Sequence, residues 1–102
     1  MAALRIDVLK ALASPVRLQI LEWLKHPTKH FQPQKDGDLV KDGVCSDYIR
    51  DKLGIAPATA SRHLTMLASV GLLVATRKKG WTFYRRHERE IAAFAKQLRA
   101  GL

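Results

Sequence analysis

The chain has 102 residues, of which 47% are apolar, and its formal net charge is +9. This length fits one domain, and the apolar content excludes a disordered chain. No apolar run approaches the roughly 20 residues of a membrane span, and the single cysteine, Cys45, excludes an internal disulfide. We therefore expect one domain over residues 1–102, with no membrane partner, in the reducing cytoplasm.

The positive charge is concentrated in the second half of the chain. Residues 1–55 hold nine Lys/Arg and seven Asp/Glu, whereas residues 56–102 hold nine Lys/Arg and two Asp/Glu. A basic half indicates a polyanionic partner, most often nucleic acid. Charge alone would also suit an anionic membrane surface, but no helix here combines a lysine-rich face with bulky apolar residues opposite.

The N-terminal part predicts two helices. Residues 4–13 carry leucines and a valine at helical spacing. Ser14 and Pro15 form an N-cap followed by a first-turn proline, which predicts a second helix that ends at Lys25.

Residues 26–43 are rich in proline, glycine, lysine and aspartate, and show no apolar period, which predicts a loop. His26 and His30 are four residues apart, a spacing that suits a metal on a helix. Pro27 lies between them and disfavours continuous helix, so a pair of solvated loop histidines is the favoured interpretation.

A helix-turn-helix is predicted next. Residues 44–45 favour one short strand, and Ser46 is a candidate N-cap for a helix over residues 47–53. Gly54 supplies a left-handed stop, and a tight turn leads into a central helix over residues 58–71. Two helices joined in this way are typical of the helix-turn-helix motif.

The central helix has two different faces. Ala60, Leu64 and Leu67 fall on one apolar stripe, while the opposite face carries hydroxyls and Arg62 and no acid. Such a face can hydrogen-bond base edges and phosphates in a major groove. Taken alone, the same pattern also fits an ordinary surface helix.

The C-terminal part predicts a basic β-hairpin and a last helix. Strands over residues 72–77 and 81–86 flank the turn 78–80. Five basic residues cluster on this hairpin: Arg77, Lys78, Lys79, Arg85 and Arg86. The cluster favours contact with a phosphate backbone over a mere solubility role. The last helix, residues 87–102, has an apolar stripe that must be buried on its own domain or on a second copy.

Three segments together resemble the ArsR/SmtB family of bacterial transcriptional repressors: ALASPVRLQIL at residues 11–21, LGIAPATASRHLTMLASVGLL at residues 53–73, and GWTFYRR at residues 80–86. They occur in the family's order and spacing, and the resemblance covers about three quarters of the chain. It implies a mostly α-helical fold with a small β-hairpin, namely a winged helix-turn-helix of five helices and a two-stranded wing.

The resemblance also implies a homodimer built on residues 1–13 and 87–102, which binds a palindromic DNA operator and leaves it when an unidentified inducer binds. The implied DNA-facing residues are Thr59, Ser61, Arg62, His63, Thr65, Arg77, Lys78 and Lys79. The implied dimer interface comprises Leu4, Val8, Ile91, Phe94, Ala95 and Leu98.

The sequence departs from the family in two places. The loop over residues 26–43 is longer than the family usually has, and Cys45 with Asp47 replaces the Cys-x-Cys pair of many metal-sensing members. Soft metals need two or three thiolates, and the last helix offers only His87, Glu88 and Glu90 near its start. We therefore expect no metal and no cofactor, and we expect Cys45 to be a small buried apolar residue.

Two further function classes fit the sequence less well. Winged helices also dock proteins, so a protein-interaction module without DNA readout is the alternative, which the acid-free segment from Leu53 to His87 disfavours. An enzyme is not expected, because no Gly-rich phosphate loop or carboxylate pair stands out and Cys45 has no histidine near it in sequence.

Overall fold

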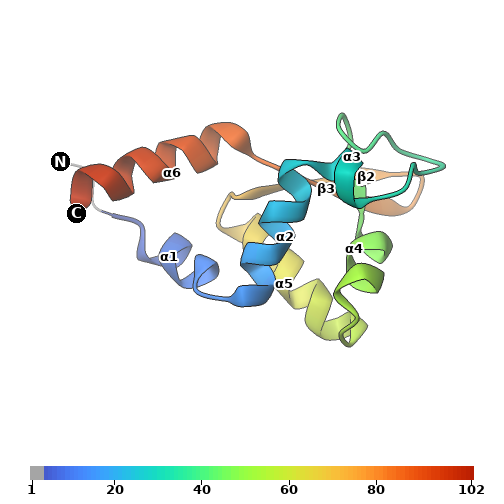
Figure 1. Cartoon of the computed structure of the whole chain (residues 1–102), viewed down its shortest axis with the longest axis horizontal. Helices are drawn as coiled ribbons and strands as arrows, with labels where there is room; N and C mark the ends of the chain where they lie inside the picture. Colours follow the sequence, from blue (N-terminus) through green and yellow to red (C-terminus); the bar gives the residue numbers. More distant parts are fainter. Residues whose placement is uncertain (1–3) are drawn as a thin grey trace.

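The computed structural model describes residues 4–102, which form six helices and a three-stranded antiparallel sheet (Figure 1). This is a winged helix-turn-helix, as the sequence predicts. In chain order the elements are α1 (Ile6–Leu12), α2 (Pro15–Lys25), α3 (Pro27–His30), β1 (Val44–Cys45), α4 (Ser46–Leu53), α5 (Pro57–Ser69), β2 (Leu73–Lys78), β3 (Trp81–Arg86) and α6 (Glu88–Gly101).

Local sequence signals fix several helix ends. The Ser14 hydroxyl accepts the Arg17 backbone N–H at 3.3 Å at the start of α2, so the predicted N-cap is confirmed. Gly54 ends α4 with φ +66°. At the end of α5, Gly71 has φ +87° and the Leu72 N–H bonds the Leu67 carbonyl at 3.0 Å, which closes a Schellman motif.

Two local expectations were wrong. Residues 27–30 form the single helical turn α3, because Pro27 can occupy a first helical position, and this makes six helices instead of five. The expectation that His26 and His30 do not share one continuous helix is confirmed, because the non-helical His26 separates α2 from α3. The second wrong expectation concerns Ser46, which is the first residue of α4 and not its cap. The strand residue Cys45 occupies the cap position, and no side chain within residues 4–102 caps this helix by a hydrogen bond.

The sheet has the order β1-β3-β2, so the predicted short strand joins the hairpin as a third member. Within the hairpin, Lys78 is still a strand residue and pairs with Trp81. The turn is therefore shorter than predicted and consists of Lys79 (φ 52°) and Gly80 (φ 81°). Positive φ at both positions is the type I′ geometry, whose twist matches that of the strands.

The core lies between the helices and one face of the sheet. The predicted stripe of α5, Ala60 with Leu64 and Leu67, is fully buried there, which leaves the opposite face of α5 to solvent. Other buried apolar side chains come from every other element except α3, and include Val8, Ile20, Leu24, Val44, Ile49, Leu73, Phe83 and Phe94.

The molecule is elongated, with principal extents of 45 × 27 × 24 Å. Figure 1 shows α1 and α6 at one end, together with the C-terminus, and the tip of the β2–β3 hairpin at the other. Only Phe94 is buried in the 14 residues of α6, so most of this helix lies outside the core. Among the described residues, no helix is long and apolar enough to cross a membrane.

Candidate nucleic-acid interface

The outward face of α5 carries three of the predicted DNA-facing residues in accessible positions. Thr59, Arg62 and Thr65 are exposed, because the stripe that includes Leu64 turns the other side of the helix into the core. No hydrogen bond or ion pair occupies the Arg62 guanidinium within residues 4–102, so its five donors remain available to a ligand. The cap residue Ala56 has no side-chain acceptor, which leaves first-turn N–H groups for an anion.

Ser61 is partly buried and faces α4. Its hydroxyl accepts from Arg50 Nη1 at 3.3 Å, and Arg50 also forms an ion pair with Asp47 in its own helix. Arg50 thus links the two helices of the helix-turn-helix. The sequence did not single out Arg50, because its role depends on how α4 and α5 cross.

His63 is partly buried as well, and faces α2. Its Nδ1 lies 2.9 Å from Arg17 Nη1, while Arg17 also donates to the carbonyl oxygens of Ala11 at 2.6 Å and Lys10 at 3.3 Å. Because arginine only donates, Nδ1 accepts, and the neutral ring carries its proton on Nε2. Burial, and then the charge of Arg17, lower the pKa of His63. Arg17 therefore connects the end of α1 to the recognition helix.

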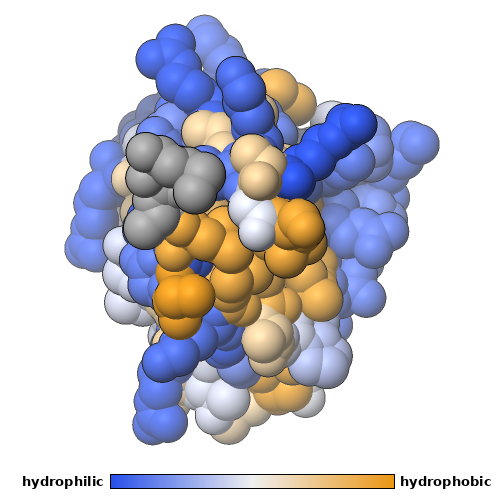
Figure 2. Space-filling view, turned by 90° about the vertical axis from the view of Figure 1, so that its left-hand side faces the viewer, coloured by the Kyte–Doolittle hydropathy of each residue, from blue (hydrophilic) through white to orange (hydrophobic). Residues whose placement is uncertain are grey.

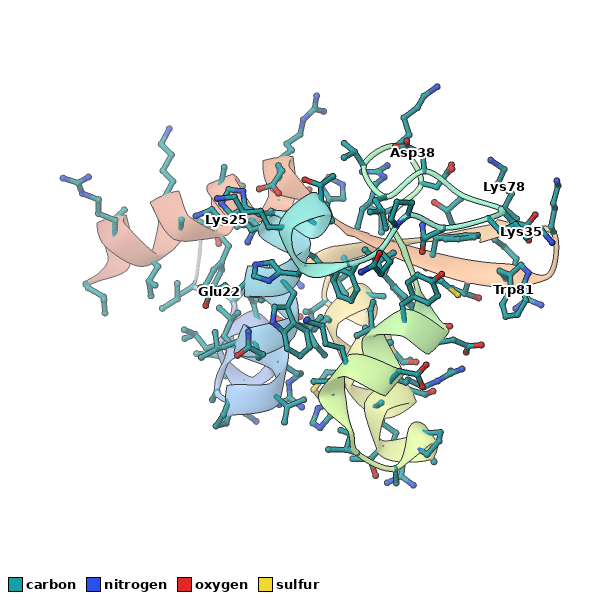
Figure 3. The ribbon with its side chains drawn as sticks, turned by 45° about the vertical axis from the view of Figure 1, so that its right-hand side comes forward. Glu22, Lys25, Lys35, Asp38, Lys78 and Trp81 are labelled. Carbon is teal, nitrogen blue, oxygen red and sulfur yellow. The ribbon has the colours of Figure 1, made fainter. Side chains whose placement is uncertain are left out.

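The wing, defined as the β2–β3 hairpin, presents Arg77, Lys78 and Lys79 at its exposed tip. The lysines are not free. Lys78 Nζ lies 3.3 Å from Asp42 Oδ2, and Lys79 Nζ lies 3.7 Å from Asp36 Oδ1. In Figure 3 the loop that carries Lys35 and Asp38 lies beside Lys78 at this end of the molecule. The sequence shows no acid near the wing, so these partners were missed.

At the base of the wing, Arg86 stabilises the fold through contacts with α2 and α6. Arg85 is exposed, but only 13% of the Arg86 side chain is. Arg86 makes two bonds to the Glu88 carboxylate, at 2.8 and 3.0 Å, and a third to the Leu21 carbonyl at 3.2 Å. Arg86 therefore joins α2, β3 and the start of α6, and the sequence-based grouping of Arg86 with the phosphate-facing cations was wrong.

The predicted dimer residues divide into two groups. Val8 and Phe94 are 1% and 8% exposed and pack in the core of their own chain, which leaves little of either side chain for a partner to contact. Leu4, Ile91 and Leu98 are half-buried and Ala95 is exposed. Figure 2 shows a continuous apolar surface over the end of the molecule that α1 and α6 form, framed by hydrophilic residues.

Cys45 and Asp47, at the position of the Cys-x-Cys pair of metal-sensing family members, have structural roles. Cys45 is buried, as predicted, and burial raises the pKa of its thiol, which disfavours the thiolate that a metal would bind. The Asp47 carboxylate is paired with Arg50. Residues 4–102 contain no group of three or more His, Cys, Asp or Glu that could hold a metal ion.

A helix-turn-helix with an exposed, uncommitted recognition face and a basic wing defines a DNA-binding protein of the winged-helix class. No protein-family profile matches the sequence. The chain is 45% identical over 97 residues to the uncharacterised HTH-type transcriptional regulator YbzH of Bacillus subtilis (strain 168). The alignment covers 95% of this chain and 97% of YbzH.

Solved structures show the same fold. HlyU from Vibrio cholerae N16961 aligns with a TM-score of 0.61 at 23% identity, covering 91% of this chain and 85% of HlyU. NolR from Sinorhizobium fredii aligns with a TM-score of 0.60 at 20% identity, covering 91% and 78%. HlyU from Vibrio vulnificus CMCP6 aligns with a TM-score of 0.58 at 26% identity, covering 93% and 83%.

The chain belongs to the HTH-type transcriptional regulators. Its function is therefore the regulation of transcription through DNA, and it is not an enzyme.

Proposed function

We propose that the chain is a homodimeric repressor of the ArsR/SmtB type, which binds a palindromic operator in the cytoplasm and leaves it when an inducer binds. The observation that carries the DNA-binding part is the outward face of α5. Thr59, Arg62 and Thr65 are exposed there without partners in the described chain, in a protein that belongs to the HTH-type regulators.

Base readout and phosphate contact fall to different parts of this surface. Arg62 projects from the middle of the α5 face, and its planar fork suits O6 and N7 of a guanine in the major groove. Thr59 lies in the first turn, where its hydroxyl and the free backbone amides suit a phosphate. Ser61 and His63 act indirectly, since their polar atoms hold α5 to Arg50 and Arg17. The wing supplies flanking phosphate contacts.

Dimer formation is supported by the surface that one chain leaves uncovered. Ala95 of α6 and Leu102, directly after this helix, are exposed, and Ile6 on α1 is 56% exposed. An apolar surface of this kind on one end of a small domain marks an interaction site. A two-fold dimer that binds a palindrome must place its two α5 helices on the same side of the duplex, about 34–36 Å apart, one helical turn of DNA.

Repression and release by an inducer rest on the resemblance of three segments to the ArsR/SmtB repressors. A dimer that occupies an operator overlapping a promoter blocks the polymerase without any further domain. The inducer is expected to act by changing the relative placement of the two α5 helices, because both must fit the operator at once.

The test begins with the full chain and a library of random duplexes. We expect the selected duplexes to contain an inverted repeat with half-sites about one helical turn apart. Light scattering should give about twice the 11.5 kDa chain mass. Placed across a reporter promoter, the selected duplex should lower transcription when the protein is present. Failure to enrich any duplex would overturn sequence-specific binding, and raised transcription would overturn repression.

A further inference from the structure

The loop between α3 and β1 is long but well fixed. The Gln34 side-chain amide donates to the carbonyls of Gly37 at 3.2 Å and Gly43 at 2.9 Å, and its oxygen accepts the Cys45 N–H. A Cβ atom at Gly37 would lie 2.6 Å from the ring of the buried Phe83, so only glycine lets the loop approach the wing this closely. The loop therefore places its side chains against the wing in a defined geometry.

This loop brings carboxylates to the tip of the wing. Lys78 pairs with Asp42 and Lys79 with Asp36. Around the open hollow between loop and wing lie four lysines and three aspartates, which leaves a net charge of only +1. The residues are Lys35, Asp36, Asp38, Lys41, Asp42, Lys78 and Lys79, with Gly37 between them.

The loop also lies on a particular side of the wing. In Figures 1 and 3 the part of the loop that carries Asp38 runs along the hairpin on the side away from α5, while Lys35 and Asp36 border a hollow together with Tyr48 of α4. The contacts with Asp36 and Asp42 hold both ammonium groups against the loop. A phosphate that approaches Lys78 or Lys79 therefore competes with a carboxylate for the ammonium group.

We propose that the loop controls how strongly the wing binds DNA of any sequence. In this proposal Asp36 and Asp42 lower that affinity by pairing with Lys79 and Lys78. This inference rests on the proposed binding of duplex DNA. Phosphate contacts supply affinity through the release of counterions from DNA. A lysine that already has a carboxylate partner gains less from a phosphate, because it exchanges one anion for another.

The size of the effect follows from the exposure of the pairs. The side chains of Lys78 and Lys79 are 47% and 69% exposed, so each pair is a weak surface contact that DNA can displace. Exposed pairs of this kind change an equilibrium by roughly 1.5- to 5-fold each. Weak, displaceable pairs make the loop a graded control of electrostatic affinity and not a barrier to binding.

The sharpest test is a double-mutant cycle on the Asp42–Lys78 pair, measured with a scrambled duplex at several salt concentrations. Asparagine at position 42 keeps the side-chain oxygen that accepts the Asp38 N–H at 2.8 Å, so the loop should remain in place. We expect Asp42→Asn to tighten binding about two- to fivefold, and to steepen the log–log salt slope by up to about one unit per protomer. In a Lys78→Gln background the same change should have a smaller effect, no larger than that of removing a carboxylate far from the wing.

Glu22→Gln is the matched control. It changes the net charge by the same amount from an exposed site on α2, which Figure 3 shows well away from Lys78. Circular dichroism should confirm that every variant is folded. The inference is overturned if Asp42→Asn tightens binding no more than Glu22→Gln, or tightens it equally in the Lys78→Gln background. A folded wild-type chain that binds neither scrambled nor selected duplex overturns the proposed function itself.

Discussion

Phe94 attaches α6 to the rest of the domain, and its truncation should be costly. The side chain is 92% removed from solvent and packs in the cluster that contains Val8 and Leu72. An aromatic side chain buries roughly 150–250 Å², which at about 25 cal/mol per Å² corresponds to about 4–6 kcal/mol. Measured Phe→Ala losses in cores are about 3–5 kcal/mol. We expect Phe94→Ala to lower the free energy of unfolding by at least about 3 kcal/mol, and Tm by roughly 12 °C or more.

Ala95 is next in the chain and has the opposite role. It is exposed in the single chain, so Ala95→Glu should leave the fold intact while it places an unpaired charge in the proposed two-fold interface. Light scattering should then give a monomer, and circular dichroism a native helix content. Lys96→Glu, at an exposed neighbouring position, is the control and should stay dimeric. A dimeric Ala95→Glu variant would refute the role of Ala95 in the dimer interface. A Phe94→Ala variant with unchanged Tm would refute the role of Phe94 in the core of its own chain.

Two more predictions concern titratable side chains, one partly buried and one buried. Because burial and Arg17 lower the pKa of His63, the unfolded chain binds this proton more readily, so stability is full above about pH 6.5 and falls as the pH drops below it. His63→Gln should remove part of that fall in urea titrations, and an unchanged pH profile would contradict the contact with Arg17. Cys45→Ser should leave DNA binding intact and cost about 1–3 kcal/mol of stability, whereas a variant that no longer responds to a metal or an oxidant in a reporter strain would contradict the structural role.

The features that the sequence predicted well depend on neighbours in the chain. Ser14 before Pro15 predicted the start of α2, and Gly54 and Gly71 predicted the ends of α4 and α5, because caps and stops are local geometry. The spacing of Leu64 and its neighbours predicted which face of α5 is buried for the same reason. The fold class followed from the order of these local elements.

The features that the sequence missed join residues far apart in the chain. His63 contacts Arg17 across 46 positions, and Lys78 contacts Asp42 across 36. Such pairs depend on how helices cross and where a long loop returns, which no periodicity encodes. The α6 stripe shows the same limit, since spacing marked Phe94 as apolar without deciding whether its own domain or a partner covers it.

The central claim is that α5 reads bases through Arg62 while other cations contribute affinity without sequence preference. Arg62→Ala and Lys79→Ala should each be titrated against the selected operator and a scrambled duplex at matched salt. Arg62→Ala should cost about 1–3 kcal/mol per half-site on the operator and much less on the scrambled duplex. Lys79→Ala should weaken binding to the operator and to the scrambled duplex by about the same factor. This factor should be smaller than the loss for Arg62→Ala on the operator, because Asp36 already pairs with Lys79. Equal losses on both duplexes for Arg62→Ala would contradict the account and make Arg62 a phosphate contact.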